Sequence, residues 1–307
     1  MKPGEPTAPA KAAPPLAAWL LATLPPLFWS GNFLFARLLR DEIPPIQMSF
    51  WRWALALAIL APFCLGPLRA EAVRIRANWR FLAALGAIGV TAFNCFVYAA
   101  LHHTTVVNGA LVNSLLPIAT FLLAFLILKQ RLGPRQIAGV LVSLAGAGVV
   151  ILRGDSASLV ALGLNRGDLM VLAGMSFWAL YTVLIRWRPL GLHPMAFLFV
   201  TIGFGVAFHL PLVAWEYAAR GGFSVTARSA GALLYFAIFP SILAYIFWNR
   251  TVATLGPGRT GMFMHLLPIF SAALAVAFLG ERLAAYHLIG FALVVGGIVL
   301  VTWTKPA

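Results

Sequence analysis

The chain has 307 residues, of which 62% are hydrophobic and 10% are charged, and its formal net charge at pH 7 is +14. A soluble domain has about 25% charged residues, so this composition excludes an ordinary soluble protein and favours one whose surface faces lipid. The basic residues lie at the ends of apolar runs, where they act as topology signals, so nucleic-acid binding is not expected.

The N-terminal residues 1–15 are rich in Pro and Ala and include Lys2 and Lys11, a composition that predicts a disordered cytoplasmic tail. Residues 16–24 are similar to the core of a signal peptide. The apolar run continues past Pro25 and Pro26 to Leu39, however, and no small-residue cleavage pattern follows it. We therefore expect a first helix that is retained.

The rest of the chain divides into apolar runs, each close to the roughly 20 residues that a transmembrane helix needs. Lipid offers no hydrogen-bond partner to the backbone, so runs of this length are expected to be helices. The predicted fold class is an all-α membrane protein of ten transmembrane helices, at residues 16–37, 45–66, 81–101, 106–128, 134–152, 167–186, 194–215, 228–250, 258–280 and 284–303.

The distribution of Lys and Arg predicts the orientation. With the N-terminus inside, the inner segments contain 14 of these residues and the outer segments contain 7. The strongest signal is the loop between the second and third spans, with Arg69, Arg74, Arg76 and Arg80. This bias predicts a multi-pass protein of the cell inner membrane with both termini in the cytoplasm.

Short motifs of the first half recur in the second half at a nearly constant spacing. Residues 115–118 (Leu-Leu-Pro-Ile) recur 151 residues later at 266–269, and Trp29 recurs 149 residues later as Trp178. The two halves, 16–152 and 167–303, each have five predicted spans, so the second half enters the membrane in the opposite orientation. We expect two inverted five-helix repeats around a central cavity, in which a site can open to either side in turn.

These motifs resemble a known family, the drug/metabolite transporter (DMT) superfamily, EamA type. The resemblance is carried by residues 29–33 (Trp-Ser-Gly-Asn-Phe), 116–118 (Leu-Pro-Ile), 267–271 (Leu-Pro-Ile-Phe-Ser) and 280–283 (Gly-Glu-Arg-Leu), and it covers about residues 16–303. It implies a ten-helix carrier that exports amino acids or other metabolites, or moves sugars, nucleotide sugars or triose phosphates. Length and aromatic content are similar to those of YddG-type exporters of aromatic amino acids, which implies a lean toward amino acids.

Polar side chains inside a membrane span are costly, so each is a candidate site residue. All 8 acidic residues fall in tails, loops or helix ends. This placement argues against a proton relay of buried carboxylates and against a Na⁺ site with a charged ligand. Facilitated diffusion, or weak proton coupling through a histidine, is favoured.

Two ionisable residues inside predicted spans each have two interpretations. His265 is expected either to titrate or bind a substrate carboxylate, or to be a neutral histidine hydrogen-bonded to a neighbouring helix. Arg52 is expected either to bind a substrate carboxylate with its guanidinium, or to extend to the outer interface or bind backbone carbonyls.

Aromatic and amide side chains at mid-depth predict the wall of a substrate cavity. For each of them the alternative is a hydrogen bond between helices. The predicted substrate-binding set, besides His265 and Arg52, is Trp29, Asn32, Asn94, Tyr98, Asn113, Trp178, Tyr181, Tyr245 and Trp248.

Two pairs of helix features occur at equivalent positions in the halves. Pro117 and Pro268 each remove a backbone hydrogen bond inside a span, and we expect them to be paired hinges or static kinks. Glycines at 139 and 146, and at 290 and 297, allow close helix contact, and we expect the two helices that carry them to be packing elements or a dimer surface.

The chain has no H-E-x-x-H, G-x-S-x-G or G-x-x-x-x-G-K-[ST] motif, so we expect no catalytic residues, no ATP hydrolysis and no cofactor. Cys64 and Cys95 lie in apolar runs, and no metal site is expected. The predicted function is a secondary transporter of small polar organic metabolites, leaning to amino acids including aromatic ones. Alternatives are a carrier of sugars, nucleotides or drug-like compounds or, less favoured, a membrane-embedded enzyme or a channel. Expected partners are the substrate and the lipid bilayer, with no ATPase subunit, in a monomer or weak homodimer.

Overall fold

The computed structural model describes residues 16–39, 41–100, 103–104, 106–155, 165–279 and 284–302. Within these ranges the secondary structure is entirely helical, without a strand. The predicted tail at 1–15 and the motif at 280–283 lie outside them.

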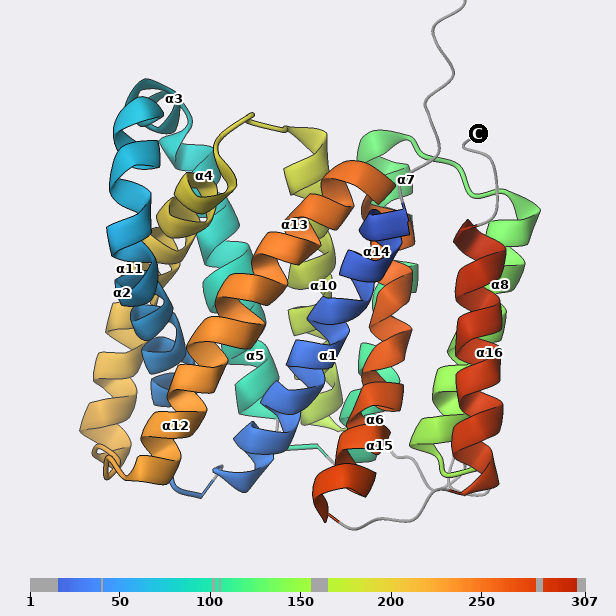
Figure 1. The fold of residues 1–307 in the computed structure, drawn as a ribbon. Coiled ribbons are helices and arrows are strands. Elements are labelled where there is room, and N and C mark those ends of the chain that lie inside the picture. Colours follow the sequence, from blue (N-terminus) through green and yellow to red (C-terminus); the bar gives the residue numbers. More distant parts are fainter. Residues whose placement is uncertain are drawn as a thin grey trace, which may run out of the picture.

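The first half of the chain contains α1 (Leu16–Leu38), α2 (Pro45–Ala70), α3 (Ala72–Ala77), α4 (Trp79–Leu85), the π-helix η1 (Gly86–Ala92), α5 (Phe93–Ala100), α6 (Val106–Asn113), α7 (Leu116–Leu128) and α8 (Pro134–Ile151). The second half contains α10 (Arg166–Trp187), α11 (Pro194–Arg220), α12 (Ala227–Phe236), the π-helix η2 (Ala237–Leu243), α13 (Ala244–Leu255), α14 (Pro257–Met262), the 3₁₀ turn η3 (Phe263–His265), α15 (Leu266–Leu279) and α16 (Ala285–Thr302). Figure 1 shows these helices side by side in one bundle, with α2 and α11 at one flank and α8 and α16 at the other.

Eight helical segments in the described part of the chain are long and apolar enough to cross a membrane. They correspond to eight of the ten predicted spans. The first predicted span is the 23-residue α1, and the fourth is divided between α6 and the 13-residue α7. The start of α1 and the end of α16 lie toward the same end of the bundle (Figure 1).

The glycines of α8 and α16 pack these two helices against each other within the chain. A Cβ atom placed on Gly297 would lie 2.5 Å from Gly139 O, and one placed on Gly146 would lie 2.8 Å from Gly290 O. Early residues of α8 thus contact late residues of α16, so the helices are antiparallel. The glycines thus pack the two helices together, as one of the two interpretations has it, while a dimer surface on these helices stays a prediction that would have to use their other faces.

The helix breaks in the fourth and ninth predicted spans come before the prolines. α6 ends at Asn113 and α7 begins at Leu116, which makes Pro117 the second residue of α7. In the same way Pro268 is the third residue of α15, after the 3₁₀ turn. A proline in the first turn removes no helical hydrogen bond, because its N–H would have no intrahelical partner. The expectation that each proline removes a backbone hydrogen bond of its helix is therefore wrong, whereas its role as a hinge or a static kink stays a prediction. Both halves have a helix break at an equivalent place.

Each half also contains a π-helical segment in the middle of a span, which no sequence pattern predicted. η1 begins at Gly86 and η2 begins 151 residues later at Ala237. π-helical turns leave backbone groups without regular partners and occur often at functional sites. Both segments lie toward the centre of the molecule, where η1 packs on α11 and η2 packs on α2.

Candidate functional site

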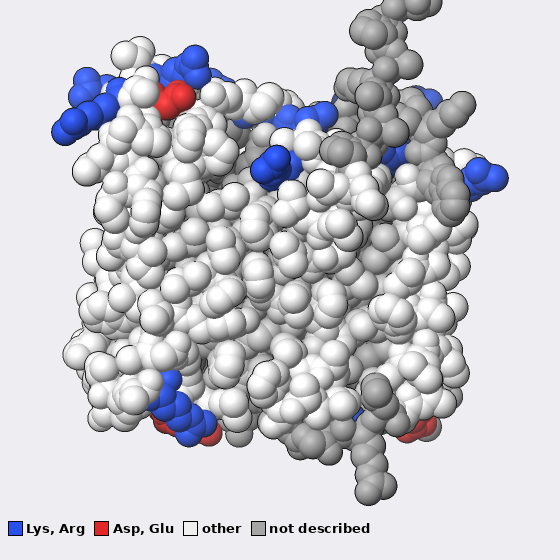
Figure 2. Space-filling model, in the orientation of Figure 1, with Lys and Arg blue, Asp and Glu red and all other residues white. Residues whose placement is uncertain are grey.

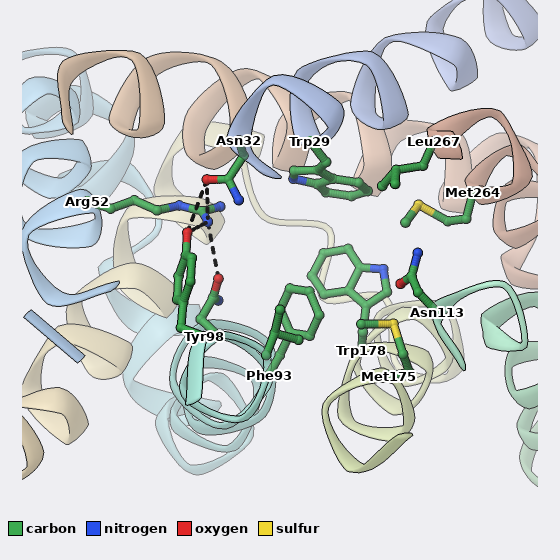
Figure 3. A pocket seen from close by; sticks show the side chains of 12 residues that line it. Trp29, Asn32, Arg52, Phe93, Tyr98, Asn113, Met175, Trp178, Met264 and Leu267 are labelled. Atoms are coloured by element: carbon green, nitrogen blue, oxygen red, sulfur yellow. Dashed lines mark hydrogen bonds between the residues drawn. The ribbon is translucent and has the colours of Figure 1, made fainter. Parts of the chain in front are cut away.

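A small cavity lies among side chains from both halves of the chain (Figure 3). Its volume is about 30 Å³, which is room for water, whereas sites for small organic ligands usually measure about 300–1,000 Å³. The structure is therefore a closed form, and an organic solute can enter only if the helices move. The lining residues are Trp29, Asn32, Arg52, Phe93, Asn94, Val97, Tyr98, Asn113, Met175, Trp178, Met264 and Leu267.

Polar groups gather at both ends of the cavity, and apolar side chains separate them. In Figure 3, Arg52 and Asn32 lie at one end and Asn113 lies at the other, with the rings of Trp29 and Trp178 between. Both rings are less than a tenth exposed, and their centroids are 5.2 Å apart in an edge-to-face arrangement. The cavity thus has polar groups at its two ends and aromatic rings between them.

Arg52 is buried, with 2% of its surface exposed, and it does not extend to the outer interface. Its guanidinium donates to five acceptors, which are Ser241 Oγ at 2.5 Å, Tyr98 OH at 3.0 Å, Pro240 O at 3.1 Å, Asn94 Oδ1 at 3.2 Å and Asn32 Oδ1 at 3.4 Å. All five acceptors are neutral. One of them, Pro240 O, is a backbone carbonyl, and binding to backbone carbonyls was the alternative to binding a substrate carboxylate.

The π-helix η2 presents two of those acceptors. Pro240 has no N–H to give to the carbonyl of Phe236, and the hydroxyl of Ser241 donates to that carbonyl instead, at 2.7 Å. The same hydroxyl oxygen accepts from Arg52. The freed carbonyl of Pro240 accepts from Arg52 and also from Trp29 Nε1 at 3.0 Å.

In the first half, the equivalent residue of η1 also has a carbonyl that accepts a hydrogen bond from a side chain. Gly89 in η1 lies 151 residues before Pro240, and its carbonyl accepts from the Tyr245 hydroxyl at 2.6 Å. In both halves a π-helical carbonyl is therefore turned toward a side chain of another helix. The π-helices bind the two halves together beside the cavity.

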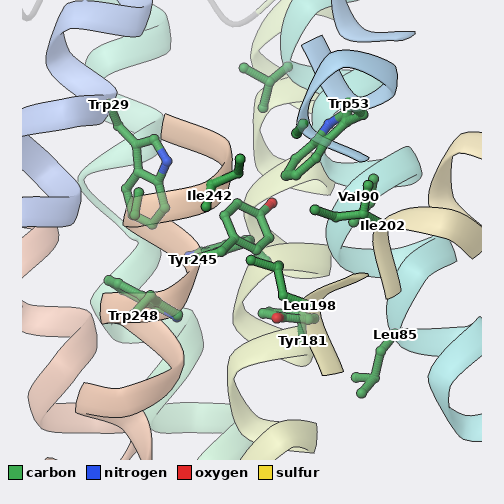
Figure 4. Close-up of a cluster of buried hydrophobic side chains, with 14 of the residues drawn as sticks. Trp29, Trp53, Leu85, Val90, Tyr181, Leu198, Ile202, Ile242, Tyr245 and Trp248 are labelled. Atoms are coloured by element: carbon green, nitrogen blue, oxygen red, sulfur yellow. The ribbon is translucent and has the colours of Figure 1, made fainter. Parts of the chain in front are cut away.

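Five of the six predicted aromatic residues, all except Tyr98, belong to one cluster, but only part of it lines the cavity (Figure 4). Tyr181, Tyr245 and Trp248 lie behind Trp29 and Trp178. The Tyr181 hydroxyl donates to Asn249 at 3.0 Å, and Trp248 Nε1 donates to Thr182 at 3.0 Å. These residues support the wall. The hydrogen bonds of Tyr181 and Trp248 run between α10 and α13, and that of Tyr245 runs from α13 to η1.

The indole N–H of Trp178 is buried without a partner among the described residues, as is that of Trp53 in the same cluster, but of the two only Trp178 lines the cavity. The side chain is 1% exposed. In Figure 3 its nitrogen faces the end of the cavity that holds Asn113. A buried donor without an acceptor is costly, so this group calls for a functional explanation.

His265 is fully buried and lies outside the cavity wall. Its Nε2 lies 2.9 Å from Ser114 O, and its Nδ1 lies 2.6 Å from Ser143 Oγ. A carbonyl only accepts, so Nε2 carries the hydrogen and Nδ1 accepts from the serine hydroxyl. Ser114 lies 151 residues before His265, which means that this hydrogen bond joins the helix breaks of the two halves.

Two buried polar groups between α2 and α11 were not among the predicted site residues. Glu216, near the end of α11, accepts from the backbone N–H groups of Ile46 and Gln47 at 3.3 and 2.8 Å, and so satisfies the start of α2. One turn further along α2, Ser49 lies 3.0 Å from the Nε2 atom of His209. The sequence shows these residues only as isolated polar positions, since their partners lie 160 or more residues away.

Comparison with known proteins agrees with this architecture. The model of the EamA-like transporter family matches the chain twice, at residues 16–152 and 165–303. The chain is 27% identical to the uncharacterized transporter YyaM of Bacillus subtilis, over 89% of each chain. It is also 27% identical to a probable terminal-alkyne amino-acid exporter of Streptantibioticus cattleyicolor, over 93% of each chain. A crystal structure with 22% identity superimposes with a TM-score of 0.73, covering 94% of this chain and 98% of the other, which shows a shared fold.

Proposed function

Because the chain belongs to the EamA-like transporter family and is a multi-pass membrane protein, we propose that it is a secondary carrier of small polar organic metabolites. We lean to amino acids, including aromatic ones, moved by alternating access. The observation that carries the proposal is the central cavity, whose wall takes side chains from both repeats. Only a site shared by the two repeats can be exposed to either side when one repeat moves against the other.

The packing of α8 and α16 supports an inverted arrangement of the two repeats. Gly139 contacts Gly297, and Gly146 contacts Gly290. Gly290 and Gly297 are the counterparts, 151 residues later, of Gly139 and Gly146. Gly139 and Gly146 therefore each contact the counterpart of the other, as a two-fold axis between antiparallel helices requires. Together with the common end of α1 and α16, this favours ten crossings in two inverted five-helix repeats (Figure 1).

The charge distribution supports the proposed orientation. Figure 2 shows Lys and Arg side chains gathered at the end of the bundle that carries α3, and fewer at the opposite end of this face. At the end with more Lys and Arg, α3 carries Arg74 and Arg76, and α4 carries Arg80. By the positive-inside rule this bias supports the proposal that this end of the bundle, with the start of α1 and the end of α16, faces the cytoplasm and that the protein lies in the cell inner membrane.

The closed cavity needs a route to opening, and the breaks between α6 and α7 and between α14 and α15 offer one. A helix interrupted at mid-span can tilt one half while the other stays packed. Pro117 and Pro268, in the turns that follow the breaks, are proposed to stiffen the moving halves on either side of these hinges.

Transport by the purified protein in liposomes tests this function. We expect saturable uptake of labelled neutral amino acids, with acceleration when unlabelled substrate is present on the far side. Uptake that rises linearly with concentration would indicate a channel, and uptake of sugars or nucleotides alone would change the substrate class. A protein that moves none of these solutes would remove the carrier interpretation.

A pair of substitutions on α10 connects transport to the cavity. Trp178→Leu removes a cavity wall, and we expect at least about fivefold lower uptake, since truncating a buried aromatic anchor costs about 1 kcal/mol or more in binding. Trp187→Leu, on the same helix but 52% exposed, is the matched control and should transport normally. Equal uptake by the two variants would mean that the cavity wall at Trp178 is not needed for transport.

A further inference from the structure

Arg52 is a buried cation that has no anion beside it in the part of the chain that the structure describes. Within the described residues no carboxylate oxygen lies within 4.0 Å of its guanidinium, and its Cζ atom lies 4.8 Å from the centroid of the Trp53 ring. Burying a charge without a counter-charge is expensive, and such groups inside a membrane protein usually serve a ligand. A cation at the edge of a cavity can be neutralised by whatever enters that cavity.

At each end of the cavity one donor hydrogen has no acceptor among the described residues. The five acceptors of Arg52 are unevenly divided, because three of them share the two hydrogens of Nη1, whereas the two hydrogens of Nη2 have one acceptor, Pro240 O. At the other end, the indole N–H of Trp178 has no partner in the described part of the chain. A ligand that completes this site must bring acceptors to both ends.

We propose that the cavity binds a monocarboxylate, with the carboxylate on Arg52, an apolar or aromatic body between Trp29 and Trp178, and an acceptor atom for the indole N–H. This inference rests on the proposed carrier function and names the substrate class of its site. A planar guanidinium offers parallel N–H groups that match a carboxylate, and the pair is strongest where water is excluded.

The site is built for one negative charge. Arg52 is the only Lys or Arg among the lining residues, so a doubly charged phosphate would remain half neutralised. The middle of the cavity is formed by Trp29, Phe93, Met175, Met264 and Leu267, which suit an apolar body.

The lining residues also include no Asp or Glu. The ammonium group of an amino acid therefore meets only amide oxygens and aromatic faces, which attract a cation weakly compared with a carboxylate. The carboxylate should contribute most of the recognition, and loss of the amino group should be tolerated.

Three probes with the same phenyl group test whether the carboxylate contributes more to binding than the ammonium group. Binding is measured with the intact protein, reconstituted in lipid nanodiscs. Phenylalanine has both charged groups, 3-phenylpropionate has only the carboxylate, and phenethylamine has only the ammonium. We expect the first two to bind with dissociation constants within about tenfold of each other, and phenethylamine to bind at least about 30-fold more weakly, the effect of losing one partner of a buried charge pair. Phenethylamine binding as tightly as 3-phenylpropionate would overturn the proposal.

Variants of Arg52 provide the second measurement. Arg52→Gln removes the charge and should weaken 3-phenylpropionate at least about 30-fold without weakening phenethylamine, whose ammonium the guanidinium repels. Arg52→Lys keeps the charge but loses the planar fork, and should lie between the two. The control is Arg228→Gln, at a side chain that is 60% exposed in a surface ion pair with Glu42, and it should bind all probes as the parent does. If Arg52→Gln does not fold, the three probes on the parent protein still decide the question.

The outcomes separate this inference from the carrier function. Saturable transport of an amine or an uncharged solute, with no carboxylate bound, would keep the carrier and refute the anion site. A protein that binds none of the probes and transports no solute would refute both.

Discussion

A single methyl group added at Gly297 tests the reciprocal contact that holds α8 and α16 together. A Cβ atom there would lie 2.5 Å from Gly139 O and 2.6 Å from Ser143 N, distances that real Cβ atoms do not show. Both contacts are backbone atoms, so the two helices must separate by a few tenths of an ångström or more. Overpacking of this kind costs about 1–3 kcal/mol, and we expect Gly297→Ala to be destabilised by that amount.

The neighbouring Gly296 is a matched control, because a Cβ atom there meets nothing within 4 Å. Alanine is favoured over glycine in a helix by up to about 1 kcal/mol, so Gly296→Ala should be neutral or slightly stabilised. The assay is thermal unfolding in detergent, followed by size-exclusion chromatography. If the two variants melt at the same temperature, the close approach of α8 and α16 is not a source of stability and the argument for their packing fails.

Two further substitutions test buried polar contacts. His265→Ala removes the hydrogen bond to Ser114 O and leaves that carbonyl buried; we expect folded protein with reduced uptake in liposomes, and unchanged uptake would separate the histidine from transport. Glu216→Gln replaces a carboxylate that accepts from the first turn of α2, including the N–H of Gln47, and should lower stability by about 1–3 kcal/mol in a thermal melt. The control Glu42→Gln breaks only an exposed ion pair and should change stability by less than about 1 kcal/mol, so equal losses for the two glutamates would contradict the capping role.

The helical class, the approximate spans and the duplication could be predicted from the sequence, because each depends on local composition or on comparison of the chain with itself. Lipid forces long apolar runs into helices, so their lengths are visible in one dimension. The family match at 16–152 and 165–303 confirms that there are two repeats.

The helix irregularities could not be predicted from the same information. Pro117 and Pro268 mark the places where the helices restart, but the breaks before them depend on how neighbouring helices pack. The π-helix at Pro240 depends on a serine hydroxyl that replaces a missing backbone donor, and on Arg52, which lies 188 residues away in the sequence. Hydrogen bonds over such a separation leave no periodic pattern.

The sequence by itself determined which polar residues lie inside the membrane-spanning helices, since hydropathy reveals a polar side chain in an apolar run. Only the tertiary structure decided their surroundings. It placed Arg52 and Trp178 on one cavity and His265 on a contact between helix breaks, and it set Tyr181, Tyr245 and Trp248 behind the wall. The reason is geometric, because a helix position fixes the depth and face of a residue, while its partners come from helices that the chain reaches many residues later.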